Sequence, residues 1–364
     1  MRSINVLGLL ATCALLASCA SASGTEEASL SQDRPVVVAT TSILGDVLTN
    51  LAGDAITVVT IMPAGADPHT FQPSAQQIAT IETASAIVIN GAGFEEGLLD
   101  SIEAAEERGT PVFEAVAAID PLGTSETGSY NHDDDHDDHD DDDHDDHDDH
   151  DDDEHDDHDD HDDDEHDDHD DDDHDDDDHD DEHDHGDVDP HFFTDPARMA
   201  EVADAAADFV IQNSEGLDLA TFRTNADSYI DDLKELDREV EATLAAIPEV
   251  RRVLVTNHNV FGYFADRYDF EVVGTVVPTS GGLEGVSGQR LAELAAVLER
   301  EDVSAVFTDS SASDELAQTL ASEVGDVAVV ALFSESLGSP DSGGGTYIEM
   351  VRTNATRIAE ALAG

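Results

Sequence analysis

The feature that most constrains this 364-residue chain is a run of Asp and His between residues 131 and 187. From His132 to Asp187 the run contains 15 His, 40 Asp or Glu and one Gly, without Lys, Arg or any apolar side chain. Such a segment cannot bury enough surface to offset the entropy of ordering, so we expect it to be disordered in isolation. The folded core must therefore come from the stretches on either side.

The run has the chemistry of a metal-binding segment, because its histidines recur mostly as H-D-D-H. Imidazole suits zinc, copper, nickel and iron, whereas carboxylates alone suit calcium or magnesium, so the histidines favour a transition metal. We predict a low-affinity collector or sensor of transition-metal ions; the alternative is a solvated acidic spacer. The candidate ligands are His132, His136, His139, His144, His147, His150, His155, His158, His161, His166, His169, His174, His179, His183 and His185.

The first residues have the pattern of an exported lipoprotein. Arg2 precedes an apolar stretch over residues 4–17, which is too short for an ordinary membrane-spanning helix but suits a secretory signal. The Leu-Ala-Ser-Cys sequence ending at Cys19 resembles a bacterial lipobox, which implies lipid attachment to this cysteine. We predict a lipoprotein signal peptide at 1–19 and a flexible tether at 20–33, with the mature protein outside the cytoplasm and anchored to the cell membrane.

The charge of the chain excludes some classes of partner. Outside the run, 48 acidic and 14 basic residues leave a formal charge of −34. This surface disfavours nucleic acid and anionic membrane patches, so no nucleic-acid partner is expected. Because Cys13 lies in the predicted signal peptide, we also expect neither a disulfide nor a thiolate metal site in the mature protein.

Two stretches of the chain alternate strands with helices. In the first, strands are predicted at 35–41, 56–62, 86–90 and 111–116, and helices at 43–52, from 74 onward, at 95–108 and, after the run, at 197–212. In the second, strands are predicted at 252–256, 270–277, 303–308 and 327–332, and helices at 288–300, 313–324 and 345–362. Apolar strands separated by helices predict parallel sheets covered on both faces.

One long helix is predicted between these stretches. Apolar residues recur at three- or four-residue spacing across residues 218–246, and Pro248 ends the pattern. A helix of this length spans roughly 40 Å. We therefore predict an α/β fold in which two similar lobes with mostly parallel sheets, at 34–217 and 247–364, are joined by one rigid helix.

The three histidines outside the run lie in compact motifs near predicted strand ends. His69 follows the second strand, and His258 follows the first strand of the second half. Glu335 follows the last strand of that half, and His191 lies in a loop just after the run. Ligands of open α/β sheets bind beyond the carboxyl ends of the strands, so two facing sheets would bring these side chains into one cleft. Three imidazoles and one carboxylate supply the four donors of a tetrahedral zinc site.

The same motifs resemble those of the zinc/manganese-binding lipoproteins of bacterial ABC importers, the cluster A-I solute-binding family. The resemblance covers roughly residues 35–362, and its motifs are PAGADPHTFQPS at 63–74, DPHFFTDP at 189–196, NHNVFGYF at 257–264, and SESLG at 334–338 followed by Thr346 and Tyr347. It implies that the metal ligands are His69, His191, His258 and Glu335, that the metal lies between the lobes, and that the partner is an ABC permease. Several zinc-specific members also carry a His- and acid-rich loop at this place.

The sequence departs from the family pattern at two positions. Many relatives have Asp where Glu335 stands, so a longer carboxylate or a water completes this site. Asp309 stands where relatives often have Glu, and we treat it as a reserve metal ligand or a hydrogen-bond partner. Without the motifs around them, lone histidines would more often satisfy a polar core than bind a metal.

The nitrogen-rich ligand set favours zinc over manganese. We predict a lipid-anchored, monomeric receptor, not an enzyme, that captures Zn²⁺ as its transported ligand and delivers it to a permease through small loop or lobe shifts. The nearest alternative is a manganese or iron receptor on the same scaffold. A second is a metal buffer or chaperone that acts through the run. A zinc hydrolase would need an open coordination position and a general base, and the sequence has neither H-E-x-x-H nor G-x-S-x-G.

Overall fold

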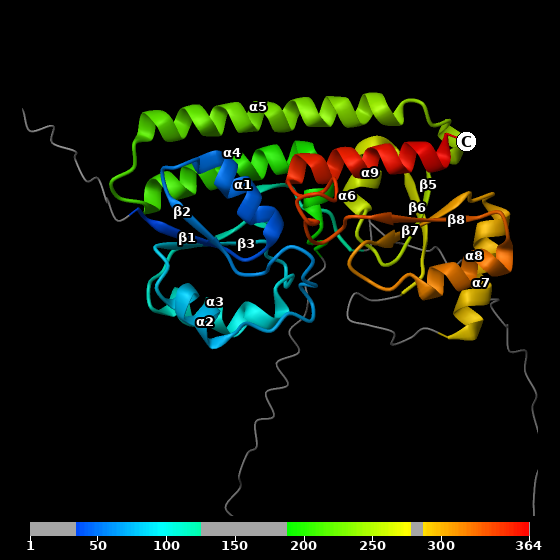
Figure 1. Cartoon of the computed structure of the whole chain (residues 1–364), viewed down its shortest axis with the longest axis horizontal. Helices are drawn as coiled ribbons and strands as arrows, with labels where there is room; N and C mark the ends of the chain where they lie inside the picture. The colour runs from blue at the N-terminus through cyan, green and yellow to red at the C-terminus, as the bar shows by residue number, and fades with distance from the viewer. Residues whose placement is uncertain (1–33, 125–187, 278–286, 364) are drawn as a thin grey trace, which may run out of the picture.

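The computed structural model describes residues 34–124, 188–277 and 287–363. Within these ranges, two parallel sheets lie side by side, and helices cover both of their faces (Figure 1). The predicted signal peptide, tether and Asp/His run lie outside the described residues.

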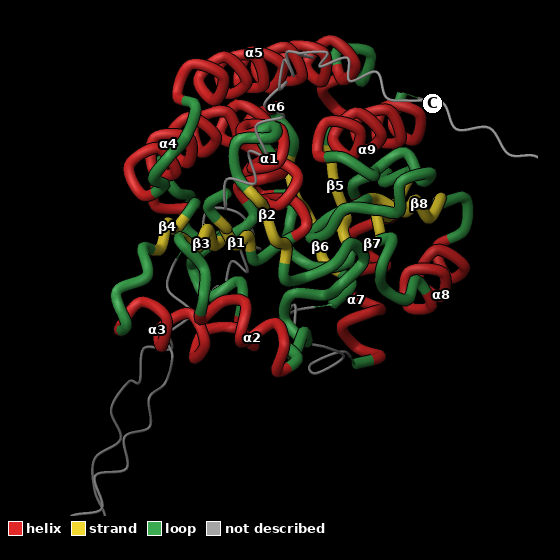
Figure 2. Tube along the Cα trace, turned by 60° about the vertical axis from the view of Figure 1, so that its left-hand side comes forward, coloured by secondary structure: helices red, strands yellow, loops and turns green. Residues whose placement is uncertain are grey.

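The N-terminal sheet has four parallel strands in the order β2-β1-β3-β4. The strands are β1 (Val36–Ala39), β2 (Thr57–Thr60), β3 (Ala86–Ile89) and β4 (Val112–Glu114). The helices of this part are α1 (Ser42–Ala52), α2 (Ala75–Glu82), α3 (Leu99–Glu107) and α4 (Pro196–Asn213), with 3-10 turns η1 (Glu96–Leu98), η2 (Val116–Ala118) and η3 (Phe192–Thr194). Helices α1 and α4 cover one face of the sheet, and α2 and α3 cover the other (Figures 1 and 2).

The C-terminal sheet repeats this arrangement with the parallel order β6-β5-β7-β8. Its strands are β5 (Val253–Thr256), β6 (Glu271–Thr275), β7 (Ala305–Asp309) and β8 (Ala328–Leu332). The helices are α6 (Gly262–Tyr268), α7 (Gly288–Arg300), α8 (Glu315–Val324) and α9 (Tyr347–Leu362), with the 3-10 turn η4 (Glu249–Arg251). Figure 2 shows the strands of both sheets between an upper and a lower layer of helices. The predicted α/β fold with two parallel-sheet lobes is confirmed.

Helix α5 (Leu219–Leu244) runs across both lobes (Figure 1). Its apolar face packs against α1 and α4 of the N-terminal lobe and against α9 of the C-terminal lobe. One continuous buried cluster therefore extends from Val37 in the first sheet through Leu233 on α5 to Tyr347 on α9. Because burial along its whole length holds α5 straight against both lobes, it acts as the rigid connection that the apolar periodicity predicts. The exact lobe boundaries remain predictions.

Strands are shorter than predicted where their last residues take part in turns. The predicted strand at 35–41 ends at Ala39, because Thr41 caps α1 by accepting a hydrogen bond from the Leu44 amide at 3.1 Å. Helix α6 was not predicted, since seven residues give too short a pattern to recognise. Among the described residues, no helix combines the length and the apolarity that a membrane crossing requires.

Candidate metal centre

Four side chains from both lobes meet beyond the carboxyl ends of the strands. His69 lies between β2 and α2, His191 directly precedes η3, His258 follows β5, and Glu335 follows β8. One nitrogen or oxygen atom from each of them lies within 4.8 Å of the corresponding atoms of the other three. The structure thus brings together the four residues that the sequence predicted as ligands. Such a group of three imidazoles and one carboxylate is a donor set that zinc and other transition metals accept.

The carboxylate of Glu335 lies at the centre of this group. Its Oε1 atom is 2.8 Å from Nε2 of His69 and 3.3 Å from Nε2 of His191. Its Oε2 atom is 3.2 Å from Nε2 of His258. All four side chains are less than a tenth exposed. Each imidazole therefore presents the same nitrogen, Nε2, to one enclosed point between the lobes.

The close packing of acid and imidazoles shifts their proton affinities. Burial raises the pKa of Glu335, but hydrogen bonds from the three imidazoles outweigh burial and hold that pKa well below its ordinary value. Burial lowers the pKa of His191, but the charge and hydrogen bond of Asp189, together with Glu335, raise it to about 9. Burial also lowers the pKa of His69, and the hydrogen bond and charge of Glu335 raise it above its ordinary value. A metal ion that enters this site must displace protons from these nitrogens.

His191 has a carboxylate partner on its outer nitrogen. Its Nδ1 atom donates to Oδ1 of Asp189 at 2.6 Å, and its backbone N–H donates to the same oxygen at 2.9 Å. Asp189 is 1 % exposed. A carboxylate on Nδ1 fixes the tautomer that leaves Nε2 free for a metal and makes that nitrogen a stronger donor. Asp189 belongs to the second predicted motif, but no sequence pattern indicated that its side chain turns back onto His191.

His69 lies on a more exposed loop, which a neighbouring aspartate shapes. The carboxylate of Asp67 accepts hydrogen bonds from the backbone N–H of His69 and from the hydroxyl of Thr70, both at 2.9 Å. The outer nitrogen of His69, Nδ1, is buried without a hydrogen-bond partner, and the nearest carboxylate oxygen, on Glu96, is 3.7 Å away. The first ligand therefore lacks the fixed carboxylate that His191 has.

Hydrogen bonds across the lobes join the loop of His69 to that of Glu335. The backbone N–H of Gly65 donates to the hydroxyl of Ser336 at 2.8 Å and to the carbonyl of Leu337 at 3.1 Å. The hydroxyl of Ser42, at the start of α1, lies 3.0 Å from that of Ser336 and accepts from the backbone N–H of Leu337. The loop that carries the carboxylate is thus fastened directly to the N-terminal lobe.

The turn between β3 and α3 supports both N-terminal histidines. The ring of Phe94 packs edge-on against those of His69 and His191, at centroid distances of 5.7 and 5.8 Å. The buried carboxylate of Glu95 accepts from the hydroxyl of Thr40 at 2.6 Å and from the backbone N–H of Asn90 at 2.5 Å. No residue of this turn was predicted to take part in the site. The positive φ angles of Gly91 and Gly93, 91° and 72°, explain why glycine occupies those positions.

Asp309, the predicted reserve ligand, is not part of the four-residue group. Its carboxylate accepts hydrogen bonds from the backbone N–H of Ser311, at 2.5 Å, and from the hydroxyl of the same residue. Burial raises the pKa of Asp309, the bonds from Ser311 lower it, and the charge of Glu335 raises it further. These contacts favour the second of the two roles considered for Asp309, that of a hydrogen-bond partner. The 15 histidines of the run and Cys19 lie outside the described residues.

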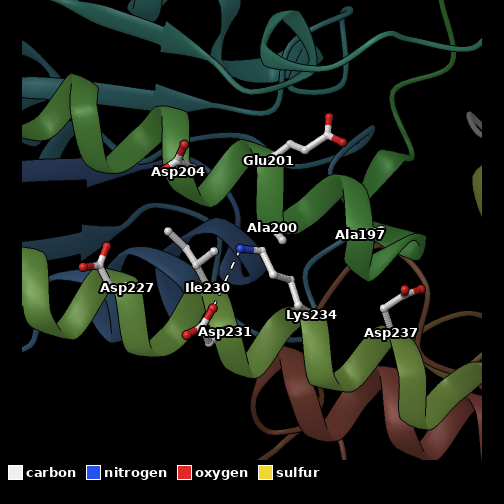
Figure 3. Close-up of a pocket in the computed structure, with 9 residues that line it drawn as sticks. All are labelled: Ala197, Ala200, Glu201, Asp204, Asp227, Ile230, Asp231, Lys234 and Asp237. Carbon is white, nitrogen blue, oxygen red and sulfur yellow. Dashed lines mark ion pairs between the residues drawn. The ribbon is translucent and has the colours of Figure 1, made fainter.

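A separate groove lies between α4 and α5 (Figure 3). It has a volume of about 590 Å³ and shares no residue with the His–Glu group. Its polar lining is acidic except for Lys234, which pairs with Asp231 at 3.8 Å. Carboxylates spread along two exposed helix faces are usual on a chain this acidic, so we assign the binding chemistry to the enclosed His–Glu group.

Comparison with known proteins identifies a family over almost the whole folded part. The model of the family described as zinc-uptake complex component A, periplasmic, matches residues 37–361. The manganese-binding lipoprotein MntA of Halalkalibacterium halodurans is 23 % identical over 351 residues, which are 96 % of each chain. The iron-binding protein YfeA of Yersinia pestis is 23 % identical over 324 residues, covering 89 % of this chain and 85 % of that protein.

The fold is also found in solved structures. The periplasmic zinc-binding protein TroA from Treponema pallidum superimposes with a TM-score of 0.68 at 24 % sequence identity, covering 91 % of this chain and all of TroA. The lipoprotein names of several relatives agree with the predicted extracytoplasmic, membrane-anchored location. The names of these relatives differ in the metal, so they do not by themselves select zinc for this chain.

Proposed function

Because this chain belongs to the family of periplasmic zinc-uptake complex components, we propose that it is the extracytoplasmic metal receptor of an ABC importer. In this proposal the receptor captures a divalent metal ion between its lobes and delivers it to the membrane permease. The observation that carries the proposal is the enclosed group of His69, His191, His258 and Glu335, whose donor atoms lie within 4.8 Å of one another. The family consists of uptake components, so no catalytic activity is proposed.

We further propose that the metal is zinc. Three imidazole nitrogens and one carboxylate form a small, nitrogen-rich set, which suits tetrahedral zinc better than manganese, an ion that prefers more oxygen ligands. The histidines of the run support the same choice, since a segment that only had to hold hard cations would not need them. The opposing observation is that curated relatives are named for manganese and iron, which makes a manganese or iron receptor the second candidate.

A competitive titration tests both proposals. Zn²⁺ is titrated, with Mn²⁺ as competitor, into the chain without residues 1–19 and 131–187, and into its His69→Ala, His191→Ala and His258→Ala versions. We expect one tight zinc site that resists manganese and that each substitution removes. Asp309→Asn serves as the control, because its carboxylate is engaged by Ser311 and should leave the site intact. Tight binding that survives all three histidine substitutions would overturn the proposed site, and preferential binding of manganese would overturn zinc.

The Asp/His run is proposed to collect or sense zinc for this site. Deleting residues 131–187 should then blunt uptake only when zinc is scarce, because the site between the lobes remains. Loss of uptake at every zinc concentration would instead support the metal-buffer or chaperone alternative. Growth and zinc accumulation of cells carrying the deletion, compared with cells carrying the intact chain, distinguish the two.

A further inference from the structure

The segment that carries His191 is hydrogen bonded to the opposite lobe on both sides of the histidine. Tyr263, on α6 of the C-terminal lobe, donates its hydroxyl to the carbonyl of Asp189 at 2.8 Å. Tyr347, on α9 of the same lobe, donates its hydroxyl to the carbonyl of Phe193 at 2.9 Å. These two carbonyls lie two residues before and two residues after His191, so the C-terminal lobe is hydrogen bonded to the segment on both sides of the histidine.

Both tyrosines are built into the core, and their hydroxyls are fully engaged. Each side chain is 0 % exposed. The Tyr263 hydroxyl also accepts from the backbone N–H of Leu122 at 3.0 Å, and the guanidinium of Arg198 lies 5.0 Å from its ring centre. Burial raises the pKa of Tyr263 to about 12 and raises the pKa of Tyr347 well above its ordinary value. Both hydroxyls therefore keep their protons at neutral pH and act as donors.

The N-terminal lobe contacts the same segment as well, because the backbone N–H of Asp189 donates to the carbonyl of Leu122 at 2.9 Å and the ring of Phe94 packs against His191. The side-chain amide of Asn90 donates to the carbonyl of Pro190 at 2.9 Å. Helix α4 begins directly after this segment, and Asp195 is its N-cap. The position of the segment therefore depends on both lobes, and α6 and α9 supply the two hydroxyl contacts on either side of His191.

We propose that Tyr263 and Tyr347 are positioning residues of the metal site, which hold Nε2 of His191 in place beside Glu335 and His258. The inference rests on the proposed metal-binding function of the His–Glu group. Its consequence is an unequal division of the ligands. His258 and Glu335 follow strands of the C-terminal lobe, and the two hydroxyls join the His191 segment to that lobe, whereas neither hydroxyl contacts the loop that carries His69.

The experiment replaces each hydroxyl and keeps the ring. Tyr263→Phe, Tyr347→Phe and the double variant are made in the full chain, with Tyr268→Phe as the matched control. The Tyr268 hydroxyl is also buried, but it donates to a side-chain oxygen of Asp237 at 3.0 Å and not to a carbonyl beside His191. The full chain with His191→Ala serves as the reference for zinc that the histidines of the run bind. The probes are Zn²⁺, in competition with a chelator, and Co²⁺, whose visible spectrum reports its coordination.

We expect each substitution at Tyr263 or Tyr347 to raise the zinc dissociation constant about 10-fold, the range found when a group that orients a metal ligand is lost. The Co²⁺ spectrum should change as well, whereas Tyr268→Phe should change neither, even if the metal-free proteins lose similar thermal stability. Unchanged affinity in the double variant, or an equal loss in Tyr268→Phe, would overturn the inference. If the unmodified chain binds no more tightly than His191→Ala, the proposed function itself fails. The single variants keep the test usable if the double variant does not fold.

Discussion

The two histidine segments of the N-terminal half are held in opposite ways. The segment around His191 is buried, has a carboxylate on the outer nitrogen of its histidine, and is hydrogen bonded at both ends. The loop around His69 is exposed at Asp67 and Thr70, and the outer nitrogen of its histidine has no hydrogen-bond partner. From this comparison we expect that the folded core places His191, whereas the position of His69 depends more on a bound ion and on the carboxylate of Glu335.

This difference has a thermodynamic consequence for metal capture. A ligand whose side chain is already ordered gives up little conformational entropy when it binds, whereas a ligand on an exposed loop gives up more. We therefore expect His191, His258 and Glu335 to form the receiving part of the site and His69 to complete it. Release would proceed in the reverse order, beginning with His69.

The largest expected effect comes from removing either histidine. Structural zinc sites bind with roughly 10–16 kcal/mol over four ligands, so losing one donor costs on the order of 3 kcal/mol, or about 100-fold in affinity. His191→Ala should lose more than His69→Ala, because the ordered donor contributes more net binding energy. Chelator competition on both variants measures the ratio. A larger loss in His69→Ala would reverse the comparison.

Replacing the carboxylate behind His191 should have the next largest effect. Asp189→Asn keeps the shape of the side chain but removes its charge, and loss of such a partner typically costs about 10- to 100-fold in metal affinity. The measurement belongs at alkaline pH, where protons compete less for the imidazole. Affinity equal to that of the unmodified chain would mean that the fold alone orients His191, without help from the Asp189 charge.

Acidity should weaken binding through the same histidine. The folded pKa of His191, about 9, lies above its ordinary value of 6.5, so the metal must displace a proton below pH 9. Affinity should fall about 10-fold per pH unit for each displaced proton. The stability of the metal-free protein should change with pH in the opposite direction, falling as the pH rises. The contribution of His191 is fully present below pH 6.5 and is lost as the pH rises through about 9. Calorimetry in buffers of different ionisation heat counts the released protons, and a count of zero would contradict the shift.

The smallest effect is expected at the acid nearest the outer nitrogen of His69. Glu96 is 45 % exposed and lies 3.7 Å from Nδ1 of His69, too far for a hydrogen bond. Glu96→Gln should therefore change zinc affinity less than about 2-fold, since an exposed ion pair contributes little in water. Direct comparison with Asp189→Asn in one titration series sharpens the contrast between the two segments. Equal losses in both variants would show that His69 has a carboxylate partner after all.

Much of the fold could be read from local patterns in the chain. Apolar runs separated by helical periodicities predicted the eight strands of the two sheets and the long helix α5, because each signal lies within one element. The four residues of the candidate site were also predicted, since each lies in a short motif and three of them follow strands whose carboxyl ends converge. Strand ends were placed less well, because residues such as Thr41 serve a turn or a helix cap instead of the ladder.

Donor type and motif are local properties of the chain, so the sequence was sufficient to predict which side chains could form a metal site. How these side chains are held depends on the packing of the two lobes, which only the folded structure reveals. The hydroxyl of Tyr347 reaches the carbonyl of Phe193 across 154 positions of sequence, and that of Tyr263 reaches Asp189 across 74. From the sequence, a tyrosine on a helix is predicted only as a core residue, and the direction of its hydroxyl becomes known from the packing. Such contacts depend on how two lobes dock along α5, and no local pattern encodes that geometry.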